Sequence, residues 1–88
     1  MDTLLTEKEI TDVQDILIEE LGVKREQLTP EATIEGDLGA DSLAKVEITM
    51  RVEDHFELNI PDEAAEQVFT VGDLMRILGE RLHSPSAR

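Results

Sequence analysis

Residues 41–56 have the sequence DSLAKVEITMRVEDHF. Their apolar residues recur at the spacing of a helix, and this helix decides the fold. Asp41 is a residue type that caps helices, since its carboxylate can accept a hydrogen bond from a free amide of the first turn. At about 100° per residue, Ile48, Val52 and Phe56 fall on one side of this helix. These three residues are the predicted inward face.

The same helix carries a second apolar stripe, Leu43, Val46 and Met50, on roughly the opposite side. A helix that packs on a small core needs only one such stripe. Carboxylates surround the second stripe and are nearly absent from the first; they are Glu47, Glu53, Asp54 and Glu57. An apolar strip framed by carboxylates suits a partner protein with an apolar centre and a basic rim. The alternative is that the preceding loop buries this stripe.

Ser42 lies in the first turn of this helix, at the edge of the second stripe. Unpaired backbone amides and the helix dipole favour a phosphate group at such a position. The alternative is that Asp41 and Ser42 only cap the helix, and spacing alone favours that interpretation.

The rest of the chain predicts three more helices. Thr6 and Glu9 have the spacing of a capping box, and Gly22 supplies a left-handed residue that ends the first helix. Pro61 begins a short third helical turn, and residues 70–73 open a fourth helix. Apolar residues at helical spacing mark the buried faces of the first and fourth helices: Ile10, Val13, Leu17, Leu21, Val71, Leu74, Met75, Leu78 and Leu82.

Residues 22–40 form a loop that is unusually long for a compact domain. Leu28, Ile34 and Leu38 give it apolar anchors, so we expect it to wrap across the helices. No segment alternates with the period of a strand. The predicted fold is all-α, a four-helix bundle with a long first loop and a short third helix, with residues 1–83 as the domain and 84–88 as a flexible tail.

The formal net charge of -13 restricts the partners. Nucleic acids and anionic lipid surfaces would repel this chain, whereas basic protein surfaces would attract it. The chain has no cysteine, which excludes disulfides and thiolate metal sites. No apolar run is long enough to insert into a membrane, and no signal peptide is apparent. We expect a cytoplasmic protein, or one in an organelle matrix after processing.

Catalysis by the chain itself is not supported. A serine hydrolase would need a base beside Ser42, but His55 is more than three turns further along the helix and His83 is near the C-terminus. A calcium loop starting at Asp37 fails because Ser42 stands where glycine is needed and Ile48 where a bidentate glutamate is needed. We therefore predict neither catalytic residues nor a metal site.

Three segments resemble one known family in the same order. Residues 38–43, LGADSL, are similar to the attachment motif of acyl carrier proteins. Residues 56–66, FELNIPDEAAE, resemble that family's segment between its second and third helices, and residues 70–74, TVGDL, resemble the start of its last helix. Asp-Ser-Leu alone is a weak signal, but the three segments in register are a strong one.

The resemblance implies that a holo-synthase, a phosphopantetheinyl transferase, attaches 4'-phosphopantetheine from coenzyme A to the Ser42 hydroxyl. The thiol of that group would carry acyl chains as thioesters to enzymes with basic docking patches. It implies a docking surface of Asp41, Leu43, Val46, Glu47, Met50, Glu53, Asp54 and Ile60, with Asp41 and Leu43 flanking the attachment site. It also implies an acyl pocket, for which Ile48, Val52 and Phe56 are the candidate lining.

Three residues depart from the pattern common in fatty-acid carriers: Ala44, Lys45 and Arg51. Lys45 falls beside the inward stripe, so its ammonium must extend past the first turn to reach solvent, where we expect it near the phosphate of the arm. The implied function is that of a monomeric, non-enzymatic acyl carrier protein in fatty-acid synthesis. The alternatives are a carrier of a polyketide, nonribosomal-peptide or aminoacyl pathway, or an unmodified interaction subunit.

Overall fold

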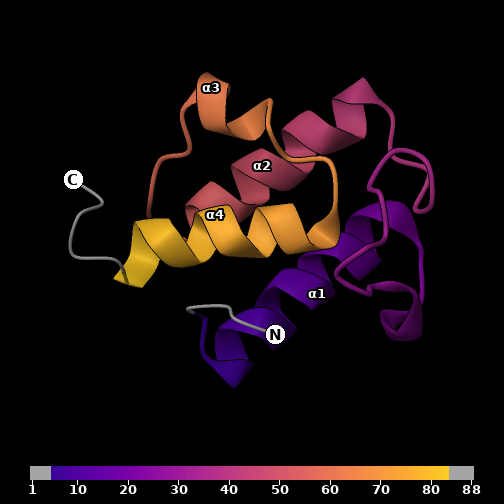
Figure 1. Ribbon diagram of the computed structural model, residues 1–88, viewed down its shortest axis with the longest axis horizontal. Coiled ribbons are helices and arrows are strands. Elements are labelled where there is room, and N and C mark those ends of the chain that lie inside the picture. The colour runs from indigo at the N-terminus through magenta and orange to yellow at the C-terminus, as the bar shows by residue number, and fades with distance from the viewer. Residues whose placement is uncertain (1–4, 84–88) are drawn as a thin grey trace.

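The computed structural model describes residues 5–83, and within them every regular element is a helix. The elements are α1 (Glu7–Leu21), the 3-10 turn η1 (Arg25–Gln27), α2 (Ser42–Phe56), α3 (Asp62–Ala65) and α4 (Val71–His83). The all-α bundle with a short third helix is thus confirmed (Figure 1). The tail predicted at residues 84–88 lies outside the described residues.

Both ends of α1 form as the sequence predicts. The Glu9 amide donates to Thr6 Oγ1 at 3.2 Å, and the Thr6 amide donates to Glu9 Oε1 at 2.9 Å. These bonds satisfy two amides that a helix start would otherwise leave unpaired. At the other end Gly22 has φ of 68° and its amide donates to the Ile18 carbonyl. The helix therefore starts and stops where its local chemistry dictates.

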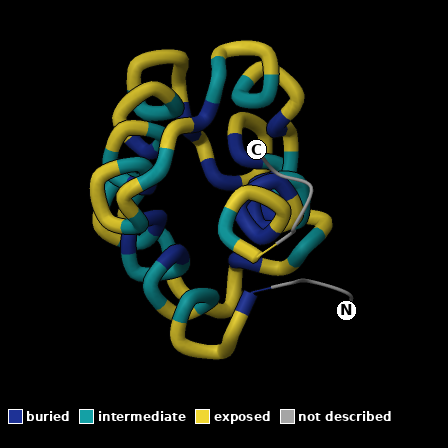
Figure 2. Tube along the Cα trace, turned by 90° about the vertical axis from the view of Figure 1, so that its left-hand side faces the viewer, coloured by how far each residue is buried: buried dark blue, intermediate teal, exposed yellow. Residues whose placement is uncertain are grey.

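The helix α4 supplies the centre of the core. Val71, Leu74, Met75 and Leu78 are buried, as predicted, while Leu82 is only partly covered. Ile77 is also buried, which the single-stripe pattern missed. In the end-on view, buried segments of the chain border the interior of the bundle, with α4 on one side of it (Figure 2). Helix α4 is thus covered on more sides than a surface helix.

The long loop is held against the start of α4. Its predicted anchors Leu28, Ile34 and Leu38 are all buried. The Gly72 amide donates to the Pro30 carbonyl at 2.9 Å, and a Cβ at Gly72 would lie 3.0 Å from that oxygen. Glycine permits this close approach of loop and helix. The loop consequently delivers residue 41 to one fixed place at the start of α2.

Helix α3 is a single turn with no buried residue. The proline that was expected in its first turn, Pro61, is instead the residue before it, with φ of -61° and an extended ψ of 154°. No helix within residues 5–83 combines the length and the apolar character needed to cross a lipid bilayer.

Candidate functional site at the start of helix α2

The first turn of α2 presents an exposed serine. Asp41 caps the helix, because its Oδ1 accepts the Ala44 amide at 2.8 Å. Ser42 is the first helical residue and is exposed, and its hydroxyl has no hydrogen-bond partner among residues 5–83. A hydroxyl with no internal partner is available to an external reagent. Asp41 therefore has a capping role, and Ser42 does not.

The two apolar sides of α2 are arranged as predicted. Ile48 and Val52 are 3% and 0% exposed, and Phe56 is partly buried. On the other side the apolar stripe is largely in solvent, with exposures of 66% for Leu43, 54% for Val46 and 57% for Met50. The alternative that the long loop covers this stripe is wrong, because the loop packs on α4 instead.

Ile60 is a correction to the predicted docking surface. Its side chain is only 5% exposed, so it belongs to the core. Its backbone amide donates to Glu53 Oε2 at 2.7 Å, which ties the chain after α2 back onto that helix. The Glu53 carboxylate therefore already accepts a backbone hydrogen bond within the protein, which leaves less of it available to a partner. Asp41, Glu47 and Asp54 are exposed, as the prediction requires.

A groove of about 360 Å³ lies beside Ser42, between α2 and α3. Its apolar wall includes Val46 and Met50, and Ser42 stands at its edge. Carboxylates from three segments surround it: Glu35, Glu53, Asp62 and Glu66. Lys45, Thr49, Ile60 and Ala65 complete the lining. The groove can therefore take a group attached at Ser42 that has both apolar and polar parts.

Lys45 is the only cationic residue among those that line the groove. Its ammonium lies 3.4 Å from the Glu35 carboxylate in the long loop, and 26% of its side chain is exposed. The stem thus runs along the protein and the charge reaches the surface, as expected. The ammonium has a carboxylate partner in the loop, so its proposed approach to a phosphate remains a prediction.

A second, much smaller hollow of about 20 Å³ lies inside the bundle behind the groove. Its lining includes Ile48, one of the three candidate pocket residues, but neither Val52 nor Phe56. The other lining residues come from the loop, α2, α3, the segment after α3, and α4: Ile34, Lys45, Thr49, Ala65, Val68 and Leu74. Sequence periodicity pointed to α2 alone, because contributions from the loop and from α3 depend on the tertiary arrangement.

Positive charge gathers on the α1 side of the molecule. Carboxylates of α1 form ion pairs with Lys8, Arg25 and Arg51, and they also contact the rings of His55 and His83. On the side of α2 and α3, several carboxylates have no ion pair among residues 5–83: Glu47, Asp54, Glu57, Asp62, Glu63 and Glu66. The negative charge around the exposed stripe is therefore less compensated than that on α1.

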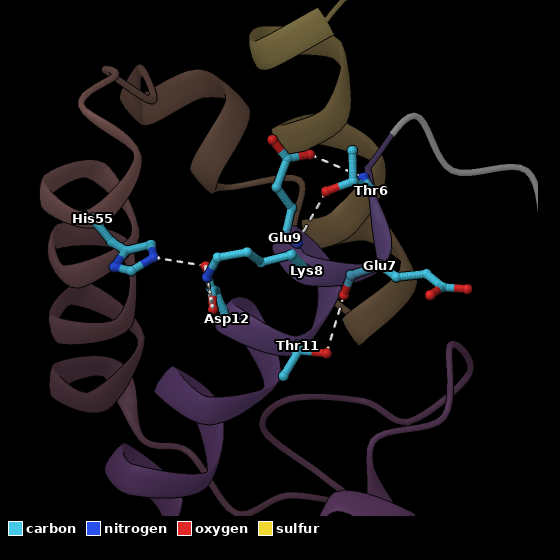
Figure 3. A network of polar contacts seen from close by, with 7 residues as sticks. All are labelled: Thr6, Glu7, Lys8, Glu9, Thr11, Asp12 and His55. Carbon is cyan, nitrogen blue, oxygen red and sulfur yellow. Dashed lines mark hydrogen bonds and ion pairs between the residues drawn. The ribbon is translucent and has the colours of Figure 1, made fainter.

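The two histidines are engaged with α1 and not with Ser42. His55 Nε2 lies 3.0 Å from Asp12 Oδ2, and His83 Nε2 lies 2.7 Å from Glu9 Oε1. Figure 3 shows the first contact together with Lys8, which also approaches Asp12. Hydrogen bonds from His55 and then Lys8 lower the pKa of Asp12. These contacts support the prediction that no histidine serves Ser42 as a base.

The second cation of α2, Arg51, also faces away from the groove. Its guanidinium bonds Glu19 and Glu20 of α1. Those hydrogen bonds raise its pKa further. Arg51, one of the three departures from the pattern common in fatty-acid carriers, is therefore a link between two helices.

Comparisons with known proteins agree with this geometry. A family profile described as "Phosphopantetheine attachment site" matches residues 11–78. The acyl carrier protein of Cyanidioschyzon merolae is 53% identical over 68 residues, covering 76% of this chain and 75% of that protein. That of Chlorobium phaeovibrioides is 48% identical over 68 residues, covering 76% and 87%.

A solved structure is similar as well. The acyl carrier protein from Enterococcus faecalis has a TM-score of 0.74 at 31% sequence identity, over 84% of this chain and 94% of that one. The residues matched by the family profile, 11–78, include Ser42 and the helices α2 and α3 beside the groove.

Proposed function

The chain belongs to the acyl carrier proteins, the family of the phosphopantetheine attachment site, and from that premise we propose that Ser42 is its attachment residue. The protein is a carrier without catalytic activity of its own, and its cofactor is 4'-phosphopantetheine. The observation that carries the proposal is the exposed Ser42 hydroxyl, which has no partner within residues 5–83 and opens onto the groove.

The residues at the start of α2 fit such a group. Asp41 uses its carboxylate to cap the Ala44 amide, which leaves the amides of Ser42 and Leu43 directed out of the helix end. A phosphate on Ser42 would meet these amides and the positive end of the helix dipole. The thiol of the bound group supplies the thioester chemistry. The polypeptide contributes the hydroxyl, the favourable charge at the helix end and the groove beside Ser42.

We propose that partner enzymes dock on the exposed stripe of Leu43, Val46 and Met50. Glu47 and Asp54 are exposed near it and have no ion pair within residues 5–83, so a basic surface would gain contacts there without breaking existing ones. Electrostatic attraction accelerates encounter, while a small apolar centre keeps affinity modest. This combination suits a carrier that must visit several enzymes. Asp41 and Glu53 belong at the margin of this surface, since both already hold backbone amides.

The same charge argues for a monomer. Two copies that met through the stripe would bring their uncompensated carboxylates together, which is unfavourable. We place the protein in the cytoplasm, where coenzyme A and acyl-processing enzymes are available, with residues 1–83 as its working domain. Fatty-acid synthesis is the proposed pathway, because Arg51, one of the three departures from the pattern common in fatty-acid carriers, faces α1 and not the groove.

Intact-mass measurement tests the attachment site. The chain is incubated with coenzyme A and a phosphopantetheinyl transferase, alongside Ser42→Ala and the control Ser84→Ala. A mass gain of one phosphopantetheine in the unaltered chain and the control, and none in Ser42→Ala, is the expected result. A gain that survives in Ser42→Ala would move the site elsewhere. No gain in any chain would favour an unmodified interaction subunit.

A further inference from the structure

The groove and the inner hollow share part of their lining. Lys45, Thr49 and Ala65 contribute to both. These three residues therefore form the partition between the groove, which opens at Ser42, and the apolar interior around Ile48 and Leu74. Any apolar chain that passes from one space to the other must pass this partition.

Of the three partition residues, Lys45 is the one that is held by charge. The Thr49 hydroxyl donates to the Lys45 carbonyl at 3.0 Å and is tied to its own helix. Ala65 has only a methyl group and belongs to the single turn α3, which has no buried residue and so costs little to displace. The Lys45 side chain instead reaches from α2 to Glu35, directly after buried Ile34 of the inner hollow.

We propose that Lys45 and Glu35 form an ionic latch over the passage between the groove and the inner hollow. An apolar acyl chain enters the core only when this ion pair opens and the Lys45 stem swings outward. Short or polar cargo stays in the groove and does not need the latch to open. Lys45 is thereby a specificity-determining residue for how cargo is held, an inference that rests on the proposed attachment at Ser42.

The latch should be weak and adjustable. The Glu35 side chain is 62% exposed, and exposed ion pairs contribute little to stability. Removing the pair should therefore raise the buried fraction of an apolar chain by about two- to five-fold, not change it from none to all. The same reasoning predicts that added salt shifts the unaltered protein in the same direction.

The test uses the full chain loaded with octanoyl or acetyl groups by a phosphopantetheinyl transferase and the corresponding acyl-coenzyme A. Methyl NMR follows Ile34, Ile48 and Leu74, and the octanoyl-minus-acetyl shift reports the buried fraction. Glu35→Gln releases Lys45 without changing the partition, and Lys45→Met keeps the stem but removes the charge. Glu31→Gln, in the same loop but lining neither space, is the control.

Both test variants should show the larger octanoyl-dependent shift, and Glu31→Gln should match the unaltered chain. Equal shifts in all loaded chains, or an octanoyl chain already fully buried in the unaltered protein, would overturn the latch. Intact mass separates this outcome from failure at the attachment step. If the unaltered chain gains no acyl-phosphopantetheine mass, the attachment proposal fails and the latch fails with it.

Discussion

Arg51 Nη1 on α2 donates to Glu20 Oε2 on α1 at 2.9 Å, and this bond joins two helices whose residues are 31 positions apart. The second nitrogen, Nη2, bonds Glu19 Oε1 at 2.6 Å. One planar guanidinium thus holds two adjacent carboxylates, a geometry that a lysine cannot reproduce. Without it, Glu19 and Glu20 would repel each other beside a helix that is already anionic.

Arg51→Gln should therefore lower the free energy of unfolding by about 1 kcal/mol, the upper part of the range for partly exposed ion pairs. Urea unfolding measures the change, with Arg81→Gln as the control, because Arg81 is exposed and has no ion pair within residues 5–83. The rate of modification by the transferase should stay unchanged, since Arg51 faces α1. A slower modification with unchanged stability would place Arg51 on the docking surface instead.

The residues that follow α1 and α2 both adopt the left-handed conformation, but one is a glycine and the other is a glutamate. Gly22 after α1 has φ of 68°, whereas Glu57 after α2 has φ of 56° and bears a side chain and a negative charge at the helix C-terminus. Gly22→Ala should destabilise the protein by about 1 kcal/mol. Its new Cβ would have no atom within 4 Å, so conformational strain alone is measured.

Glu57→Gly should have the opposite effect and stabilise the protein by about 1 kcal/mol. It relieves the left-handed strain and removes a carboxylate that opposes the helix dipole. Thermal and urea unfolding of both variants give the comparison. A destabilised Glu57→Gly would mean that the Glu57 side chain has a favourable role that outweighs both costs.

Local chemistry explains which parts of the fold were predictable. Thr6, Glu9, Gly22 and Asp41 act through neighbours within four residues, so their roles follow from spacing alone. The two-sided pattern of α2 was equally informative, because a helix on a small core needs only one apolar stripe, although exposure of the second stripe was decided only by the structure. These features located the exposed serine and the stripe beside it.

The misplaced residues depend on contacts that spacing does not encode. Ile60 resembles a docking residue in sequence, but the hydrogen bond from its amide to Glu53 accompanies its insertion into the core. Glu35, which no motif singled out, reaches Lys45 only because the long loop folds back over α4. Long-range placement of a loop was the missing information in this case.

Acid should weaken the contacts of α1 with the two histidines. Glu9 has an ordinary pKa of 4.5, which hydrogen bonds from the Thr6 amide and then His83 lower in the folded protein. The pKa of Asp12 is lowered from 3.8, chiefly by His55. A lowered folded-state pKa means that the stabilisation is present above the ordinary pKa and is lost as the pH falls through the lowered one.

Melting temperatures of the unaltered chain and of two variants, measured across a range of pH, should show this loss of stability. Glu9→Gln and Asp12→Asn should each be less stable than the unaltered chain at neutral pH. The gap should close as the pH falls below about 4.5 for Glu9 and below about 3.8 for Asp12. Glu31→Gln, which removes a loop carboxylate that has no ion pair within residues 5–83, should not be destabilised at neutral pH. A gap that persists in acid would show that these side chains act through packing and not through charge.

Added salt should raise the melting temperature. The net charge of -13 is concentrated where carboxylates lack partners, and self-repulsion in the compact state is screened by counterions. Salt also weakens the α1 ion pairs, but these are partly exposed and contribute less. Magnesium at matched ionic strength should act more strongly than sodium, because a divalent ion neutralises neighbouring carboxylates together.

The control for the salt effect is a double variant, Glu63→Gln with Glu66→Gln, which removes charge from the α3 segment. Its melting temperature should be higher at low salt and respond less to added salt. A flat response of the unaltered chain would mean that the carboxylates are too far apart to repel one another appreciably.

Once Ser42 is modified, the Lys45 ammonium can pair with either of two anions, the Glu35 carboxylate or the phosphodiester on Ser42. In the unmodified chain its ammonium lies 3.4 Å from Glu35, and Lys45 and Ser42 line the same groove one helical turn apart. A phosphodiester on Ser42 would compete with the largely exposed Glu35 carboxylate for this ammonium.

Lys45→Thr should therefore shift the phosphorus NMR signal of the modified protein and the proton signals of the arm. Glu35→Gln should shift the phosphorus signal in the opposite direction, because it removes the competitor and leaves the ammonium to the phosphate. Identical phosphorus and arm spectra for the unaltered chain and Lys45→Thr would show that the ammonium stays with Glu35 and takes no part in directing the arm.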